Sequence, residues 1–220
     1  MIDIVLAPDL AGRVKLGVLV LEGVGVREHA PALVAEIGEE AGRLRVRYAG
    51  SKSAEVPGAA DARALYKTLG LDPTKTRPSN EALLRRVLKG EDLHRVNTLV
   101  DALNLVSLRH QLPFGLYDLD QVQPPVALRK GRVGESYEGI RKGPVNVEDR
   151  PLLADAGGPF GNPTSDSART SITLATRNAL VVAWAPAAFP PGRFAAVLAD
   201  AAQTLTRHAG GEPGEARIVA

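Results

Sequence analysis

Cysteine is absent from the 220 residues of this chain. Its absence excludes disulfide bonds, thiol nucleophiles and thiolate metal sites, and redox chemistry therefore does not fix the compartment. The histidines show no spacing typical of metal ligands, so we expect no zinc site, and nothing in the sequence calls for a cofactor. They are His29, His94, His110 and His208. No serine stands in a nucleophile elbow, so the sequence announces no catalytic nucleophile.

Long apolar runs are also missing. The longest, Val14 to Val26, is interrupted by Lys15, Glu22 and several glycines. Met1 to Ala7 lacks the basic segment and the cleavable apolar core of a signal peptide. We therefore expect neither export nor membrane insertion, and the expected location is cytoplasmic. With 45% hydrophobic and 24% charged residues, the chain can bury the core of one large domain or two small ones.

The net charge is only +2, but the basic residues are concentrated in two segments. Between Arg63 and Arg95, eight basic residues stand against four acidic ones, and between Arg129 and Lys142, five stand against two. Attraction to phosphates depends on local rather than total charge, so this pattern suits a polyanionic partner. Two solvated surface faces would give the same pattern, and charge alone leaves both interpretations open.

The first half of the chain is predicted to begin with strands and to continue with helices. The predicted strands are Ile2 to Ala7 and Val14 to Leu21. Apolar residues at helical spacing predict helices over Pro31 to Arg47, Asp61 to Leu69, Ser79 to Lys89 and Asp92 to Leu108. Asp61 and Ser79 are the expected N-caps, and Gly70 and Gly90 are the expected stops.

The second half is predicted to be sheet with a closing helix. Short apolar runs bounded by Gly, Pro or Asn predict strands at Pro125 to Arg129, Leu152 to Asp155, Ser171 to Ala175 and Leu180 to Trp184. A helix is expected from Pro190, and the tail from Gly210 to Ala220 is expected to fray. The predicted fold class is α+β, a single compact domain over residues 1–215 with a mixed β-sheet or sandwich core flanked by helices.

A basic loop is followed directly by a basic helix between Thr74 and Lys89. Loop side chains and the first helix amides could reach a phosphate, and the apolar residues of the helix leave its basic residues outward. The predicted RNA-contacting residues are Lys75, Arg77, Arg85, Arg86 and Lys89. A capped basic loop with no ligand is the simpler interpretation of the same residues.

Polar groups gather in three further places. Asn97, Asp101 and Asn104 share one side of the helix predicted at Asp92 to Leu108, where an ordinary solvated face would look the same. The glycine-rich loop from Gly157 to Thr170 permits close backbone approach and could hold a carbonyl oxygen, although a turn-rich loop capped locally by Asp166 would look alike. The loop lacks the Gly-Lys-Ser/Thr ending of a P-loop. The third segment, Gly134 to Gly139, sets Glu135 beside an aromatic residue and says little alone.

Several of these segments occur in the same order as motifs of a known domain. They are Arg95 to Asn104, Pro113 to Asp120, Leu128 with Arg129, Gly134 with Glu135, and the glycine-rich loop. In this respect the chain resembles the editing-type tRNA-binding domain in the beta subunit of phenylalanyl-tRNA synthetase. The resemblance covers about residues 61–176, and its most specific part is the Asn-x-x-Val-Asp-x-x-Asn pattern that begins at Asn97. No aminoacylation core fits in the remaining length, so the chain looks like a freestanding version of that domain.

The resemblance implies tRNA or aminoacyl-tRNA as the partner and hydrolysis of misacylated tRNA in trans as the activity. The implied enzyme is a deacylase rather than a complete aminoacyl-tRNA ligase. The expected catalytic residues are Glu135, Asp166 and Thr170. The expected substrate-binding residues are Asn97, Asp101, Asn104, Gly115, Gly158, Gly161 and Ser165. Alternatives are a noncatalytic RNA-binding module and a small-molecule binding protein that has kept the fold.

The chain departs from the synthetase motifs at two places. Where the family reads Pro-Leu-His-Ala-Phe-Asp, this chain reads Pro-Phe-Gly-Leu-Tyr-Asp from Pro113 to Asp118, so an imidazole is replaced by Gly115. Where the family has a glutamate that ends a late strand, this chain has Leu174, Ala175 and Thr176. The family's domain removes tyrosine wrongly attached to the phenylalanine tRNA, and the two departures leave open whether this chain recognises tyrosine, another amino acid or none.

Overall fold

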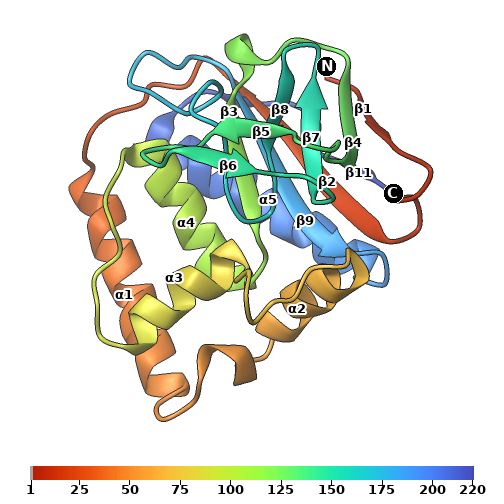
Figure 1. Ribbon diagram of the computed structural model, residues 1–220. Helices are drawn as coiled ribbons and strands as arrows, with labels where there is room; N and C mark the ends of the chain where they lie inside the picture. Colours follow the sequence, from red (N-terminus) through yellow and green to blue (C-terminus); the bar gives the residue numbers. More distant parts are fainter. Residues whose placement is uncertain (1) are drawn as a thin grey trace.

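The computed structural model describes residues 2–220 and confirms the α+β class (Figure 1). The helices are α1 (Pro31–Arg47), α2 (Ala59–Thr68), α3 (Ser79–Leu88), α4 (Thr98–His110) and α5 (Pro191–Ala209). The strands are β1 (Ile4–Leu6), β2 (Val14–Glu22), β3 (Phe114–Asp118), β4 (Val126–Lys130), β5 (Ser136–Glu138), β6 (Pro144–Asn146), β7 (Pro151–Asp155), β8 (Gly158–Gly161), β9 (Ala179–Pro186), β10 (Glu212–Pro213) and β11 (Arg217–Val219). Short 3-10 turns stand at Ser53–Glu55 and Leu119–Gln121.

Two sheets form the centre of the fold. The central sheet has the strand order β10-β2-β9-β3, with β11 also paired to β2, and all of its pairs are antiparallel. The second sheet has the order β1-β4-β7-β8, and its β1–β4 pair is parallel whereas the others are antiparallel. The expected mixed sheet is therefore present. A separate hairpin, β5–β6, lies in front of β3 in Figure 1.

The central sheet is covered on both faces, which explains why β9 is apolar along its length. Successive side chains of a strand point to opposite faces. Val181 packs with the helical core of α4 and α5, whereas Val182 packs with Trp184 and the second sheet. Burial of each such side chain stabilises the fold by roughly 1.5–3 kcal/mol. The sheet is thus held between a layer of helices and a second sheet.

The longest helix, α5, packs one apolar stripe on the central sheet. Phe194, Val197, Leu198 and Ala201 are buried at helical spacing, and β2 provides room for them because Gly17 has no side chain. A β carbon at Gly17 would lie 3.0 Å from Phe194 Cζ. Among residues 2–220, no helix combines the length and the apolar character that crossing a membrane would require.

Helix α1 lies beside α3 and α4 at one side of the molecule (Figure 1). A third apolar cluster joins the three helices, with Leu44 from α1, Leu84 and Val87 from α3, and Leu108 from α4. The Arg45 side chain reinforces the contact, because its Nε donates to the Val87 carbonyl at 2.8 Å. This packing leaves the 91–96 segment between α1 and α4.

Helix α4 begins six residues later than predicted. Asn97 is its N-cap, with an extended backbone and a side-chain oxygen that accepts from Val100 N at 3.0 Å. One turn further on, the Asp101 carboxylate accepts from Val96 N at 3.0 Å. Leu93 and Val96 fit the apolar spacing of the helix, but the two side-chain caps hold the chain before Thr98 out of helical conformation.

The starts of two other helices also differ from the prediction. Helix α2 begins at Ala59 after Gly58, so Asp61 lies inside the first turn instead of capping it. Helix α3 is preceded by Pro78 as N-cap residue, and Ser79 is already helical. Pro78 has an extended ψ of 144°, and a proline disfavours helical conformation in the residue before it, so the helix does not start earlier. The Ser79 hydroxyl is buried without a hydrogen-bond partner among residues 2–220.

The segment Ser171 to Ala175 is not the predicted strand. Its β-branched residues form a turn, in which Thr173 N donates to Thr176 Oγ1 at 3.0 Å and Thr176 N donates to the Thr173 carbonyl at 3.2 Å. Thr176 Oγ1 in turn donates to Asp118 Oδ2 at 2.6 Å. Local side-chain bonds of this kind compete with sheet pairing, and here they prevail.

The C-terminal tail is not frayed, contrary to the prediction. Strands β10 and β11 both pair antiparallel with β2, with Glu212 opposite Glu22 and Val219 opposite Leu16. Gly210 and Gly211 adopt positive φ between α5 and β10, a conformation that glycine reaches without strain. The tail thereby covers the edge of β2.

Candidate functional site

A cavity of about 380 Å³ lies between α4, β3 and two loops. Most of its wall is apolar, and the polar side chains among its lining are Asn104, Arg141, Asp166 and Ser171. The apolar lining residues are Val96, Val100, Leu103, Phe114, Leu116, Ile140 and Ile172. An apolar cavity with a few convergent polar groups is typical of a ligand site. Asn104 and Asp166, two residues predicted from the sequence, meet here.

A smaller hollow of about 200 Å³ adjoins this cavity. It shares Leu103, Asn104 and Phe114 with the first and extends toward Ser79 on α3 and Thr164 in the glycine-rich loop. Asn104 thus lines both hollows. Its amide forms no hydrogen bond within residues 2–220 and is free to contact a ligand in either space.

Asp166 is the unusual acid of the site. Its Oδ1 atom is buried and accepts no hydrogen bond from the part of the chain that the structure describes. Burial raises the pKa of Asp166 to about 7, and the neighbouring Tyr117 hydroxyl and the positive charge of Lys142 offset only part of this rise. A carboxyl group that titrates near neutral pH can accept and return a proton, as general base catalysis requires.

Tyr117, on β3, lies beside Asp166 and was not predicted as a site residue. Its ring is buried edge to face against Phe160 at 4.9 Å between centroids, and its hydroxyl has no hydrogen-bond partner within residues 2–220. Burial first, and then the negative charge of Asp166, raise the pKa of Tyr117. Its neutral hydroxyl is therefore retained throughout the ordinary pH range.

Gly115 and Gly161, which were predicted to bind substrate, flank the Tyr117 ring. A β carbon at either position would lie 2.6 Å from Tyr117 Cζ and closer still to other atoms of the phenol. Real β carbons do not approach heavy atoms this closely, so the position of the phenol requires glycine at both sites. The structure gives these glycines a packing role next to the cavity, and neither of them lines it.

The glycine-rich loop is held by a compact hydrogen-bond network. Asn162 Oδ1 accepts from Thr164 N at 2.8 Å and from Ser165 N at 3.0 Å, and Asn162 Nδ2 donates to the Tyr137 hydroxyl at 3.0 Å. Tyr137 completes the network by donating to the Ser165 carbonyl at 2.7 Å. Ser165 therefore takes part in placing Asp166 and does not itself line the cavity.

Two predicted catalytic residues lie outside the cavity. Glu135 is held by Arg129 at 2.6 and 2.7 Å and accepts from Arg132 N at 2.8 Å, and the Arg129 hydrogen bonds lower its pKa. Thr170 is buried, with its Oγ1 3.1 Å from Ser167 Oγ and its carbonyl bonded to Asp118 N. Of the three residues predicted to be catalytic, the structure brings only Asp166 to the cavity.

The predicted polar row on α4 is divided. Asn97 caps the helix and Asp101 faces a different cavity, between α1 and α4, so only Asn104 reaches the space that holds Asp166. Gly158 begins β8 at a φ of +110°, a conformation that favours glycine. The backbone conformation therefore explains why this residue is glycine, without any contact to a ligand.

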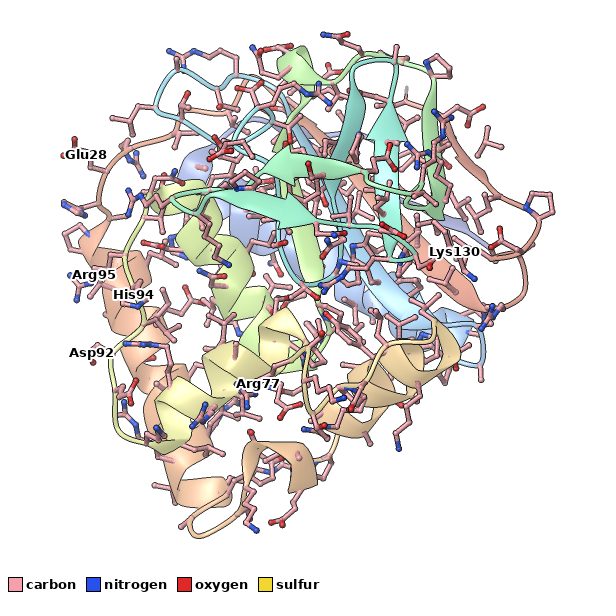
Figure 2. The ribbon with its side chains drawn as sticks, in the orientation of Figure 1. Glu28, Arg77, Asp92, His94, Arg95 and Lys130 are labelled. Atoms are coloured by element: carbon pink, nitrogen blue, oxygen red, sulfur yellow. The ribbon has the colours of Figure 1, made fainter. Side chains whose placement is uncertain are left out.

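The predicted RNA-contacting residues are partly neutralised by acids. Arg77, labelled next to α3 in Figure 2, has its Nε 3.8 Å from Glu81, which also binds Arg63 at 2.8 and 2.9 Å. Arg86 and Lys89 lie 3.3 and 3.8 Å from Glu91. Lys75 and Arg85 are exposed and form no ion pair within residues 2–220. The face is therefore less positive than its composition indicates.

Sequence reasoning missed the proximity of Tyr117 to Asp166. The signal available was the spacing of Gly115 and Tyr117, because residues two apart on a strand share a face and a glycine leaves room over its neighbour. Arg141 was counted only as part of the second basic segment, yet it lines the cavity. Within the described residues, no group of three or more His, Asp or Glu side chains is arranged to hold a metal ion.

Comparison with known proteins identifies one family. The family described as the B3/4 domain matches residues 61–204. Among solved structures, an N-terminal fragment of the phenylalanyl-tRNA synthetase beta-subunit from Pyrococcus horikoshii is similar, with a TM-score of 0.49 and 12% identity. The similarity covers 96% of this chain and 50% of that one, so this chain spans about half the length of the fragment. No curated protein matches.

Proposed function

Because the chain belongs to the B3/4 domain family, a domain of the type found in the beta subunit of phenylalanyl-tRNA synthetase, we propose that it binds aminoacyl-tRNA and hydrolyses misacylated tRNA in trans. The motif resemblance from Arg95 to Asp120 supports tRNA as the partner. The observation that carries the hydrolytic part is Asp166, a buried carboxyl with a pKa of about 7 in the wall of an apolar cavity.

In the proposed reaction, Asp166 acts as general base. Its carboxylate accepts a proton from a water molecule, and the water oxygen forms a bond to the carbonyl carbon of the ester. The bond between that carbon and the ribose oxygen then breaks, and the ribose oxygen takes the proton from Asp166, which regenerates the base. The products are the free amino acid and deacylated tRNA. A positioned general base contributes about 10²- to 10⁴-fold to the rate.

Two other residues are suited to orienting the ester. Asn104 stands where the two hollows meet, so its amide can hydrogen-bond a substrate that extends through both. Arg141 places a positive charge in the wall of the cavity, where it would stabilise negative charge on the carbonyl oxygen or bind the terminal phosphate. The positive charge of Lys142 lowers the pKa of Asp166 and thereby favours its carboxylate form.

The wall of the cavity favours an apolar amino acid side chain. Val100, Leu103, Leu116 and Ile172 line the space. An apolar pocket separates side chains that differ by one methylene by only about 1–3 kcal/mol, so we expect a graded preference among apolar amino acids.

The decisive test is single-turnover deacylation of a matrix of correctly and wrongly charged tRNAs, tyrosyl-tRNA-Phe among them. We expect hydrolysis of at least one mischarged tRNA, with Asp166→Asn lowering the rate about 10²- to 10⁴-fold. Asp149→Asn is the matched control, because Asp149 is an exposed acid at a positive φ that asparagine tolerates. A protein that binds tRNA but deacylates no member of the matrix would contradict the proposed activity.

A noncatalytic RNA-binding module is the second candidate. The observation in its favour is that Glu135 and Thr170 are engaged in structural contacts away from the cavity. This candidate requires salt-sensitive RNA affinity without esterase activity. A small-molecule binding protein that has kept the fold would instead lose nothing when Arg77, Arg85 and Arg86 are replaced by Glu.

A further inference from the structure

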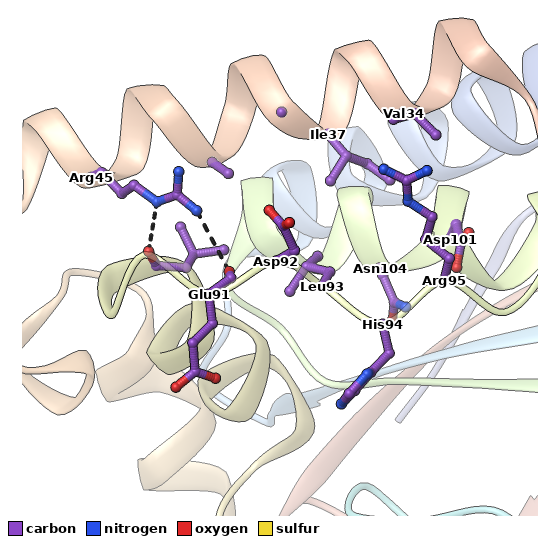
Figure 3. A pocket seen from close by; sticks show the side chains of 13 residues that line it. Val34, Ile37, Arg45, Glu91, Asp92, Leu93, His94, Arg95, Asp101 and Asn104 are labelled. Atoms are coloured by element: carbon purple, nitrogen blue, oxygen red, sulfur yellow. Dashed lines mark hydrogen bonds between the residues drawn. The ribbon is translucent and has the colours of Figure 1, made fainter.

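A second cavity, of about 190 Å³, lies between α1 and α4 under the 91–95 segment (Figure 3). It shares only Asn104 with the cavity that holds Asp166. Helix α1 precedes residue 61, the first residue of the family match, so one wall of this cavity comes from outside the matched region. Val34, Ile37 and Ala41 make that wall apolar.

Asp101 is the buried acid at one end of this cavity. Only 7% of the surface of Asp101 is exposed, and its Oδ1 accepts a hydrogen bond from Val96 N at 3.0 Å. The other carboxylate oxygen accepts no hydrogen bond from residues 2–220, although the residue lines the cavity. Burial raises the pKa of Asp101. A buried carboxylate with free lone pairs is stabilised by a cationic hydrogen-bond donor, and no group among residues 2–220 donates to this oxygen.

A free positive charge stands at the same end. Figure 3 shows the Arg95 guanidinium near Asp101 and α1, and Arg95 forms no ion pair within residues 2–220. Its charge is close enough to lower the pKa of Asp101 in opposition to burial. At the other end, the Arg45 guanidinium is already engaged with the carbonyls of Val87 at 2.8 Å and Glu91 at 3.5 Å. The Asp101 end offers both an unused carboxylate oxygen and a guanidinium without an ion pair among residues 2–220.

We propose that this cavity binds a small zwitterion with an apolar body, of the α-amino acid class. The ammonium group donates to the free oxygen of Asp101, the carboxylate accepts from Arg95, and the side chain lies against Val34 and Ile37. A volume of about 190 Å³ is below the roughly 300–1,000 Å³ of sites for drug-sized ligands, which suits a ligand of this size. The binding does not depend on ester hydrolysis at the other cavity.

Titration calorimetry of the full chain with L-leucine and with L-phenylalanine tests the proposal. We expect saturable binding of at least one of them, and at least tenfold weaker binding of the matching N-acetyl and amide derivatives, each of which lacks one charge. Asp101→Asn should weaken binding at least tenfold, because it removes the negative charge that the ammonium group requires. The asparagine keeps an oxygen that can accept from Val96 N, so the start of α4 is preserved. Arg95→Gln should weaken binding in the same way.

A cavity-filling variant separates binding from folding. Gly38 on α1 lines the cavity, and a β carbon there would meet no atom within 4 Å, so Gly38→Leu can enter the space without a backbone clash. Gly42→Leu is the matched control, since Gly42 is on the same helix, has the same free surroundings and does not line the cavity. We expect binding to be lost in the first variant and kept in the second, with neither melting temperature lowered.

Three results would overturn this inference. They are an absence of saturable binding by the unmodified protein, binding that survives Gly38→Leu, and binding that is unchanged in Asp101→Asn. Deacylation by Gly38→Leu should equal that of the unmodified protein, so failure of the amino acid site and failure of the hydrolytic site are measured separately.

Discussion

The phenol of Tyr117 occupies the space that a side chain at Gly115 would fill. In the synthetase motif that the chain resembles, histidine stands at the position of Gly115 and phenylalanine at that of Tyr117. Residues two apart on a strand point to the same face, so the Tyr117 ring can lie over Gly115. The Tyr117 hydroxyl, which neighbours Asp166, thus fills the space beside Gly115.

The first prediction concerns the contact between Gly115 and the Tyr117 phenol. Gly115→Ala places a β carbon against the Tyr117 phenol, and such overpacking costs about 1–3 kcal/mol. The free energy of unfolding in urea measures the cost. Gly143→Ala is the control, because a β carbon there meets nothing within 4 Å. Tyr117→Phe removes the nearest atom, so it should reduce the cost of Gly115→Ala, and strictly additive effects would show that the two positions are not coupled.

The second prediction concerns the pH dependence of hydrolysis. A general base must be ionised, and the pKa of Asp166 is about 7. The single-turnover rate should therefore rise about tenfold per pH unit well below pH 7 and level off above it. A stable mischarged ester and a pH range from about 5 to 8.5 allow the profile to be measured. A profile that is flat across this range would remove Asp166 from the proposed role.

The third prediction concerns stability and follows from the same shift. The pKa of Asp166 in the folded protein is raised above the ordinary value of 3.8, so the folded state keeps a proton that the unfolded state has lost between about pH 4 and 7. The free energy of unfolding should therefore fall as the pH rises through this window, by on the order of a few kcal/mol. Asp166→Asn cannot ionise and should be more stable than the unmodified protein at pH 8. Equal stability of the two proteins at pH 8 would contradict the shift.

The fourth prediction concerns Glu81, a buried acid on the basic helix α3. It accepts from Arg63 at 2.8 and 2.9 Å and from Ser53 at 3.2 Å, and only 2% of its side chain is exposed. Glu81→Ala removes the partner of the half-buried Arg63 guanidinium, which should lower the free energy of unfolding by about 3–5 kcal/mol. Chemical unfolding should show this loss, whereas Glu39→Ala, an exposed change on α1, should alter stability by less than about 0.5 kcal/mol.

Apolar spacing predicted the elements whose burial is strong and local. The apolar run of β9 and the apolar stripe from Phe194 to Leu205 on α5 both occur where expected, because each pattern matches the surfaces that bury it. Apolar spacing gave the wrong helix start before Thr98, where the side-chain caps of Asn97 and Asp101 compete with the helix. Leu93 packs against the cluster of α1, α3 and α4, whereas Val96 is 45% exposed. A local hydrophobic pattern carries no signal for such competition.

The site was predicted only in part because its contacts are distant in sequence. Asn104 and Asp166 could be named from their segments, but nothing local shows that Arg129 holds Glu135 or that Glu91 neutralises Arg86. The same limit applies to the tail, whose glycines indicate fraying although β2 provides a partner strand. These ion pairs and strand pairs join residues far apart in the chain, and local patterns in one sequence do not show which distant residues meet.

Strand β2 determines where this protein can be cut. It ends before residue 61, outside the family match, yet it pairs with β9 from Val14 opposite Pro186 to Leu21 opposite Ala179. A fragment limited to residues 61–204 would leave the whole inner edge of β9 unpaired and one side of α5 without its sheet. Such an edge is a template for association with other chains. Expression boundaries chosen from the family match alone would therefore yield an aggregating fragment, and the N-terminal strand must be included.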